Sequence, residues 1–306
     1  MHDYISKNVN RSIPVGYSAA DVRPILVDTF NYLTCTIANS TSSAIDFFGL
    51  NSYSWCGNDT FQSSTYSTLV QDFQNGSQPV MFSEMGCNLV SPRPFSEIQA
   101  IYGPDMLNVF SGALVYEWTQ EQNNYGLVQI NGNGSVSLLQ DYVNLQNQYN
   151  LLNMTALTSA SVSQTSAKAP TCQSSLISTS GFPNTFDIPA RVSGIDALIN
   201  SGVTQGIHVG ALVSVSSQNI PETVYNPDGG IISGIRLNVL GNGVSNTPGS
   251  NTSGNTTSAS TSSSTGTATA SAASASKTGA ASTQRASGTL GVFGAISALV
   301  AVALSF

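Results

Sequence analysis

Apolar and polar stretches alternate on a regular scale through the first half of the chain. Four apolar, β-rich runs, IPVGYS, IDFFGLNSY, PVMFSEMG and ALVYEWT, begin at Ile13, Ile45, Pro79 and Ala113, so their starts lie 32, 34 and 34 residues apart. Between them lie helix-compatible stretches such as SAADVRPILVDTFNYLT and TFQSSTYSTLVQDFQN. Strand and helix alternating at this spacing indicate βα units around a parallel sheet. A (β/α)8 TIM barrel has eight such units in about 250 residues, so residues 1–153 are predicted to form four of them, the C-terminal half of the barrel with strands five to eight.

The pattern changes after residue 153. Residues 154–240 contain short strand-like pieces, HVGALVSVSS and GGIISGIRLNVL, and one helix-like piece, VSGIDALINSG, which together predict a small β-rich accessory region. Residues 241–281 are rich in Ser, Thr, Gly and Ala and contain no aromatic or acidic residue. Such a composition cannot bury enough apolar surface to offset the entropy of ordering, so we expect a disordered, O-glycosylated stalk.

The last residues follow the order of a glycosylphosphatidylinositol (GPI) attachment signal. Small residues at Gly279, Ala280 and Ala281 precede a polar spacer, and the apolar run LGVFGAISALVAVALSF ends the sequence. We therefore expect residues 282–306 to be a cleaved signal and Gly279 to carry the anchor. The alternative is a C-terminal transmembrane helix, but the run from Leu290 to Phe306 has only 17 residues and no basic residue follows it.

Composition narrows the class of partner. The 306 residues are 41% hydrophobic and only 8% charged, with 9 Lys and Arg and a net charge of -7. So few basic residues cannot build the positive face that nucleic acid requires. Eight N-x-[ST] triplets favour a glycosylated secretory protein. They begin at Asn10, Asn39, Asn58, Asn75, Asn133, Asn153, Asn251 and Asn255.

The four cysteines fit the same secretory context. No two of them have a C-x-x-C spacing, and with only 2 histidines in the chain a metal site is not expected. We expect two disulfides instead. The first residues, MHDYISKNVNRS, lack the apolar core of a signal peptide. Together with the count of four βα units, this leads us to expect that the chain is a piece of a longer one.

Candidate site residues come from the ends of the predicted strands. In a βα barrel, reactive groups collect at the carboxyl ends of the strands, where the loops form the open face. A glutamate there can act as a nucleophile, and several aromatic rings beside it favour a carbohydrate, whose rings stack on them. The residues selected in this way are Tyr17, Asn51, Tyr53, Glu84, Tyr116 and Glu117, with aromatic neighbours at Trp55, Trp118 and Tyr125.

Three blocks, FFGLNSYSWCG, PVMFSEMGCNLVSPRPF and FSGALVYEWTQEQNNYGLV, closely resemble those of the fungal cell-wall β-1,3-glucanosyltransferases, glycoside hydrolase family 72. The resemblance covers residues 1–153 and extends to the GPI-type tail. It implies that Glu84 is the nucleophile of a retaining mechanism and that Tyr53, Tyr116 and Tyr125 line the sugar subsites, beside Asn51 and Glu117. It also implies the disulfides Cys56–Cys87 and Cys35–Cys172.

One feature of the family is missing from this sequence. A retaining glycosidase needs a second carboxyl as acid/base, about 5–5.5 Å from the nucleophile. In the family this is the glutamate of an Asn-Glu pair, and none of the five glutamates here follows an asparagine. Glu117 is the one internal substitute, although a subsite or structural carboxylate is the preferred interpretation. We therefore expect this chain alone to be inactive.

The resemblance predicts an enzyme that cleaves β-1,3-glucan and passes the new end to another glucan chain, with no metal or diffusible cofactor. It implies anchorage through GPI at the outer face of the cell membrane and in the cell wall. Two alternatives remain: an inactive GPI-linked wall glycoprotein that still binds glucan, and a plain β-1,3-glucan hydrolase.

Overall fold

The computed structural model describes residues 1–38, 40, 43–153, 157, 167–203 and 217–237. The chain divides into two compact units, Met1–Gly234 and Ile235–Phe306. All the helices and strands given below belong to the first unit.

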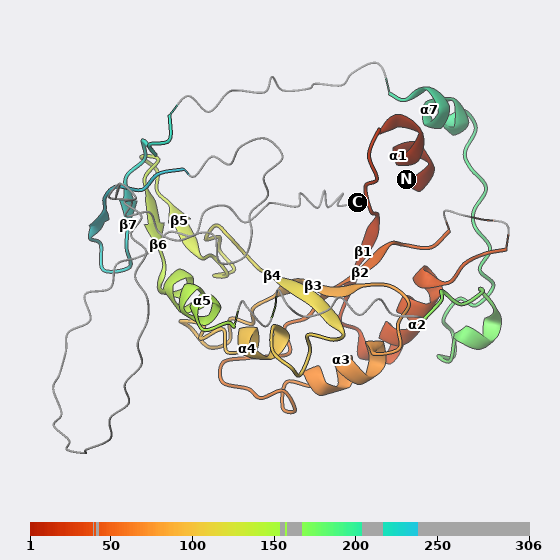
Figure 1. Ribbon diagram of the computed structural model, residues 1–306, viewed down its shortest axis with the longest axis horizontal. Helices are drawn as coiled ribbons and strands as arrows, with labels where there is room; N and C mark the ends of the chain where they lie inside the picture. Colours follow the sequence, from red (N-terminus) through yellow and green to blue (C-terminus); the bar gives the residue numbers. More distant parts are fainter. Residues whose placement is uncertain (39, 41–42, 154–156, 158–166, 204–216, 238–306) are drawn as a thin grey trace, which may run out of the picture. The chain divides into compact units, whose positions relative to one another are not determined.

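A four-stranded parallel sheet forms the centre of this unit (Figure 1). Its strands, in spatial order, are β1 (Gly16–Ala20), β2 (Phe47–Asn51), β3 (Val80–Met85) and β4 (Phe110–Val115). Helices α2 (Arg23–Thr34), α3 (Tyr66–Phe73) and α4 (Glu97–Ile101) follow β1, β2 and β3 in turn. The prediction of alternating strands and helices around a parallel sheet is therefore confirmed.

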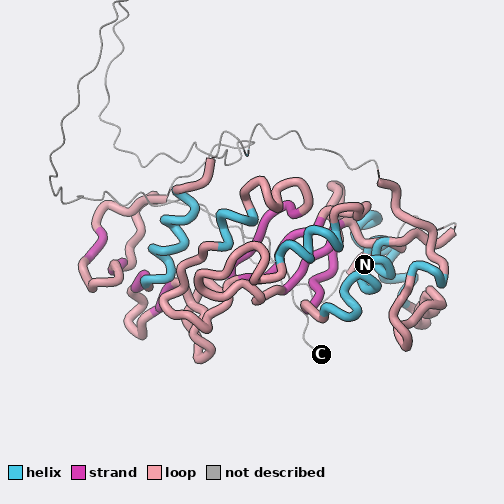
Figure 2. The backbone as a smooth tube through the Cα atoms, turned by 90° about the horizontal axis from the view of Figure 1, so that it is seen from below, coloured by secondary structure: helices cyan, strands magenta, loops and turns pink. Residues whose placement is uncertain are grey.

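The three helices cover one face of the sheet, and the side chains of the strands explain why. Figure 1 shows α2, α3 and α4 below the strands, and in Figure 2, seen from below, helices lie in front of them. Alternate residues point to this face: Phe48, Leu50 and Phe82 are fully buried. Phe30 of α2 packs edge-on against Phe48 at 5.3 Å, and Phe82 stacks on Phe110 of β4 at 4.6 Å. This aromatic core holds the strands and helices together.

A second sheet follows the first. The strands β5 (Val128–Ile130) and β6 (Val136–Leu138) form an antiparallel hairpin whose turn includes Gly134 at φ 83°. Helix α5 (Gln140–Asn150) comes directly after it. The short strands β7 (Val224–Tyr225) and β8 (Ile231–Ile232) extend this sheet, because β7 pairs with β6 and β8 with β7. The pattern of strands and helices predicted from the sequence did not include the β5–β6 hairpin.

Residues 167–203, which we call the clasp segment, bind to the amino-terminal helices. The disulfide Cys35–Cys172 joins the segment to the end of α2, and the segment contains η1 (Ser174–Leu176) and α7 (Ile195–Ser201). Helix α1 (His2–Asn8) contacts α7, where Asn8 Nδ2 donates to the carbonyl of Ile199 at 2.9 Å. Asp28 of α2 accepts the backbone N–H groups of Ser178 (3.0 Å) and Thr179 (2.7 Å).

The prediction of a small β-rich region over 154–240 stays a prediction. In the described part of that range the strands are β7 and β8, of two residues each, and the expected helix is α7. Most of HVGALVSVSS lies outside the described residues. The same holds for the expected stalk at 241–281, for Gly279 and for the expected attachment signal at 282–306.

Among the residues that the structure describes, no helix is both long enough and apolar enough to cross a membrane.

Candidate active site

Glu84 and Tyr53 meet at the carboxyl ends of neighbouring strands. Glu84 lies near the end of β3, and Asn51, the last residue of β2, is its partner in the sheet register. An irregularity in the pairing at Leu50 and Asn51 shifts the register there. Two residues beyond Asn51, the phenol of Tyr53 donates a hydrogen bond to Glu84 Oε2 at 2.7 Å. The carboxylate therefore has an oriented donor on one oxygen.

Three tyrosines, Tyr53, Tyr116 and Tyr125, form a cluster that we call the tyrosine rim. Their ring centroids are 6.3 Å (Tyr53 to Tyr116), 5.5 Å (Tyr53 to Tyr125) and 5.3 Å (Tyr116 to Tyr125) apart, each pair edge to face. Burial, and then the bond to Glu84, raises the pKa of Tyr53 far above its ordinary value. Burial and the neighbouring Glu117 raise the pKa of Tyr116. Both phenols therefore stay protonated; Tyr53 donates to Glu84, and the Tyr116 hydroxyl accepts from Asn123 Nδ2 at 3.5 Å.

Asn51 belongs to a small hydrogen-bonded group on the sheet face opposite the helices. Its Oδ1 accepts the hydroxyls of Ser18 (2.8 Å) and Ser83 (2.7 Å), whose oxygens lie 2.7 Å apart. These three residues come from β1, β2 and β3. Gly49 lies beside them, and a Cβ there would lie 2.6 Å from the Ser83 hydroxyl. The sheet therefore carries polar groups on the face that leads to Glu84.

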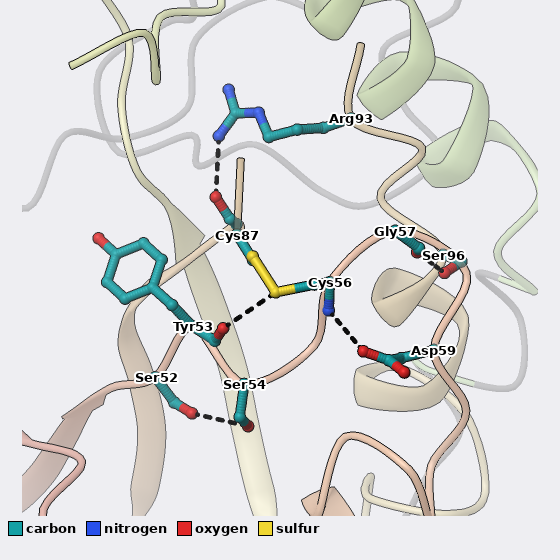
Figure 3. Close-up of a disulfide and its surroundings, with 10 residues drawn as sticks. Ser52, Tyr53, Ser54, Cys56, Gly57, Asp59, Cys87, Arg93 and Ser96 are labelled. Carbon is teal, nitrogen blue, oxygen red and sulfur yellow. Dashed lines mark hydrogen bonds between the residues drawn. A yellow bond between two sulfur atoms is a disulfide. The ribbon is translucent and has the colours of Figure 1, made fainter. Parts of the chain in front are cut away.

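The disulfide Cys56–Cys87 joins the loop after β2 to the loop after β3 (Figure 3). It is one of the two pairs that the family resemblance implies, and Cys35–Cys172 is the other. The backbone N–H of Cys56 donates to Asp59 Oδ2 at 3.0 Å, which fixes the turn after the cysteine. The cross-link lies three residues from both Tyr53 and Glu84, so it holds the two partners of the 2.7 Å bond together.

A buried arginine that sequence reasoning missed lies behind the tyrosine rim. The side chain of Arg93 is 1% exposed and pairs with Asp141 of α5, Nε to Oδ2, at 2.6 Å. Figure 3 shows its guanidinium beyond the disulfide, reaching toward the loop that contains Cys87. The signal that could have revealed it is a single arginine within SPRPF, in a chain with only 9 basic residues.

The remaining predicted residues take different positions. Glu117 follows Tyr116 through a cis peptide bond, and its Oε1 is buried without a hydrogen-bond partner among the described residues. Trp118 is 54% exposed and Tyr17 is 48% exposed. Trp55, expected among the rim aromatics, is instead 5% exposed and packs against Tyr66 in the core, so that expectation was wrong. Sequence position alone could not separate a rim ring from a core ring.

The described residues contain no group of three or more His, Cys, Asp or Glu side chains arranged to hold a metal ion. The chemistry available at the strand ends is that of two carboxyl groups, Glu84 and Glu117, three phenols and the amide of Asn51.

Residues 1–153 match the family described as Glucanosyltransferase, glycoside hydrolase family 72. The 1,3-beta-glucanosyltransferase gel2 of Aspergillus fumigatus is 54% identical over 250 residues, which are 82% of this chain and 52% of that protein. The probable 1,3-beta-glucanosyltransferase GAS3 of Saccharomyces cerevisiae is 41% identical, over 70% of this chain and 42% of that protein. The chain thus spans about half the length of these curated relatives.

A solved structure, Saccharomyces cerevisiae Gas2p in complex with laminaripentaose, is 42% identical to the chain. The match covers 49% of this chain and 33% of that one, with a TM-score of 0.46.

Proposed function

Because this chain belongs to the glucanosyltransferase family, we propose that it supplies the nucleophile half of a retaining β-1,3-glucanosyltransferase. The observation that carries the proposal is the 2.7 Å bond from Tyr53 to Glu84, at a strand end beside Tyr116 and Tyr125. It supports the proposal because a sugar that stacks on these aromatic rings could be reached by the neighbouring carboxylate. Curated relatives named as 1,3-beta-glucanosyltransferases support the same reaction class.

In the first step, a Glu84 oxygen attacks the anomeric carbon of a glucose unit within the donor glucan. The bond from that carbon to the bridging oxygen breaks, and the oxygen leaves with a proton from the general acid. The product is a glycosyl ester on Glu84. Tyr53 stays neutral and donates to the carboxylate, so it holds the attacking group in one orientation.

In the second step, the 3-hydroxyl of an acceptor glucan attacks the same carbon. Its proton passes to the general base, and the Glu84 carboxylate is released. Tyr116 and Tyr125 stack on the sugars, while the Asn51 amide N–H donates to a sugar hydroxyl and the Glu117 carboxylate accepts from one. The net result is a longer β-1,3-glucan chain.

We propose that the acid/base comes from residues outside these 306. Of the five glutamates, Glu97 is buried in α4, Glu121 and Glu222 are exposed in loops, and Glu117 is the only other one close to a strand end. None follows an asparagine. By the same reasoning, the four parallel strands are half of an eight-stranded barrel. Coverage of about half of the relatives supports both points.

The partners that we propose are β-1,3-glucan donor and acceptor chains in the fungal cell wall. The tail sequence supports a GPI anchor at Gly279 and a place at the outer face of the cell membrane. Release of the protein from membranes by a phosphatidylinositol-specific phospholipase would test this, and a mature chain still ending at Phe306 would contradict it.

The nucleophile is tested with an activated donor, a 2-deoxy-2-fluoro β-1,3-oligoglucosyl fluoride. Fluoride leaves without a proton, so the first step needs no general acid, and the fluorinated glycosyl ester persists long enough for mass spectrometry. We expect the label on the peptide that contains Glu84. Glu84→Gln removes it, and the matched variant Glu117→Gln keeps it. A folded chain that takes no label, or takes it elsewhere, would refute the assignment.

One observation favours a second function, a glucan-binding protein without catalysis: the chain has no Asn-Glu pair. In that case Glu84→Gln leaves the affinity for a β-1,3-oligoglucan unchanged, and no label forms on the wild-type chain. A hydrolase would be recognised in the full-length protein by products that are never longer than the substrate.

A further inference from the structure

The backbone bonds of Arg93 converge on the loops that carry the tyrosine rim. One guanidinium nitrogen, Nη1, donates to the carbonyls of Gly86 (3.1 Å) and Tyr116 (2.7 Å). The other, Nη2, donates to the carbonyl of Tyr125 at 2.5 Å. These oxygens belong to the loop after β3, the end of β4 and the loop before β5. A single buried side chain therefore joins three segments that are separate in sequence.

The position of Arg93 is itself fixed from α5. Asp141 accepts both the Nε of Arg93 at 2.6 Å and its backbone N–H at 3.1 Å. Asn144, one turn further along α5, donates to the carbonyl of Arg93 at 2.8 Å. The guanidinium carbon also lies 4.7 Å from the Phe95 ring centroid and 5.8 Å from that of Tyr125. The arginine therefore has little freedom to move independently of α5.

The geometry suits a guanidinium and no other side chain. Its five N–H donors lie in one plane, which allows it to bind a carboxylate and three carbonyls at the same time. A lysine ammonium has three donors from one point and cannot reach all four partners. Gly86 completes the fit, because its φ is 115° and a Cβ there would lie 3.1 Å from Arg93 Nη1.

We propose that Arg93, held by Asp141, is the positioning residue that sets Tyr116 and Tyr125 at their places facing Tyr53. Neither Arg93 nor Asp141 touches the sugar in this role. The role in positioning the rings is independent of catalysis, but its consequence for sugar binding rests on the proposed function. Glu84 and Tyr53 are held separately, by β3 and by the Cys56–Cys87 disulfide.

The positioning role is tested without sugar by hydrogen exchange. Two backbone hydrogen bonds cross residues 116–127, which we call the rim loop. The N–H of Glu117 donates to the carbonyl of Tyr125, and the N–H of Leu127 donates to the carbonyl of Glu117, both at 3.0 Å. Arg93→Lys should raise their exchange rates at least about tenfold, while those of Phe48 and Leu50 in β2 stay unchanged. The matched control is Arg23→Lys, since Arg23 pairs with Asp21 and donates to Ser54 and Thr65, all of which lie outside residues 116–127. Unchanged exchange at Glu117 and Leu127 in a folded Arg93→Lys would overturn the proposal.

Where Arg93→Lys does not fold, Asp141→Asn replaces it. This variant keeps every carbonyl bond of Arg93 and removes only the charge that anchors it, so the same amides should exchange faster by about threefold or more. A rate equal to that of the wild type would again overturn the proposal.

Sugar binding gives the second readout. With the 2-fluoro donor, Arg93→Lys should raise the half-saturating concentration about tenfold and leave the maximal labelling rate within about threefold. Leu26→Ala serves as the control for a general loss of stability, because Leu26 is a buried residue of α2. It should change neither the half-saturating concentration nor the maximal labelling rate. A fall in the labelling rate alone, with unchanged half-saturation, would contradict the proposed role. Faster exchange together with an unlabelled wild type would instead leave the positioning role intact and refute the nucleophile assignment.

Discussion

Two regions of the compact unit each contain a disulfide and a buried carboxyl group. In the clasp segment, Cys35–Cys172 closes a loop of 137 residues and Asp28 binds Ser178 and Thr179. At the tyrosine rim, Cys56–Cys87 closes a loop of only 31 residues, and Glu97 of α4 is buried near Arg93. The first disulfide attaches a distant segment, whereas the second joins two neighbouring loops that are already close together in the sequence.

The two carboxylates differ in charge although both are buried, Asp28 at 2% and Glu97 at 4% exposed. Burial acts to raise the pKa of Asp28, but hydrogen bonds from Thr179 and Ser178 outweigh it, and the pKa lies below its usual range. Burial raises the pKa of Glu97 to about 7, with only small opposing effects from its own backbone N–H and from Arg93. The comparison shows that the donors around a buried carboxyl, more than its depth, decide whether it is ionised.

The largest effect on stability should come from removing the long cross-link. In the chain-entropy account, a disulfide that closes 137 residues stabilises by about 5 kcal/mol. We expect Cys35→Ser with Cys172→Ser to lower the free energy of unfolding by about that amount in urea titrations. Labelling of Glu84 in the folded protein should be unchanged. A loss of labelling would show that the clasp segment and the site are coupled.

Removing the Cys56–Cys87 disulfide should lower the free energy of unfolding by less than removing Cys35–Cys172 does. It should, however, slow the labelling of Glu84 more. For a loop of 31 residues the same account gives about 4 kcal/mol. Cys56→Ser with Cys87→Ser also frees the loop that holds Tyr53, so labelling of Glu84 should slow about tenfold at saturating donor. If Glu84 were labelled at the wild-type rate in both disulfide variants, the two disulfides would not differ in their effect on the site.

Replacing Glu97 should change how stability depends on pH. The folded chain keeps a proton on Glu97 that the unfolded chain releases above pH 4.5, so the free energy of unfolding falls as pH rises from 4.5 to about 7. The loss amounts to about 3 kcal/mol and is complete above pH 7. Glu97→Gln should remove this slope in unfolding experiments at pH 4.5, 6 and 8. If the free energy of unfolding depended on pH in the same way in the wild type and in Glu97→Gln, Glu97 would be ionised in the folded chain.

The smallest effect should come from Asp28→Asn, and its pH dependence has the opposite sign. Because the pKa of Asp28 is lowered by folding, its contribution is present above pH 3.8 and is lost as pH falls through the folded pKa. We expect a cost of about 2 kcal/mol at pH 7, which shrinks as the pH falls below 3.8 and through the lowered pKa of the folded state. Hydrogen exchange of Ser178 and Thr179 should accelerate in parallel. A cost that grows in acid would contradict this account.

The sequence predicted the parallel sheet because each strand is a continuous apolar run set off by polar, glycine-containing turns. It also identified Glu84 and the three rim tyrosines as neighbours, because the ends of parallel strands meet at one edge of a sheet. The β5–β6 hairpin was missed although NGNG between VQI and SVSL is a hairpin signal. Arg93 was missed for a different reason, since its partner Asp141 lies 48 residues away and no local pattern joins them.

The bonds from Arg93 to the rim have a consequence for how this protein family can vary. All three end on carbonyl oxygens of the main chain, at Gly86, Tyr116 and Tyr125. Every amino acid supplies such an oxygen, so a different side chain at Tyr116 or Tyr125 leaves the anchoring bond available. At Tyr116 the path of the loop and the identity of the ring can therefore be altered independently, whereas the Tyr125 ring also contacts the guanidinium of Arg93. This makes Tyr116 the natural position at which to exchange a ring and redesign the choice of sugar while Arg93 and Asp141 are kept.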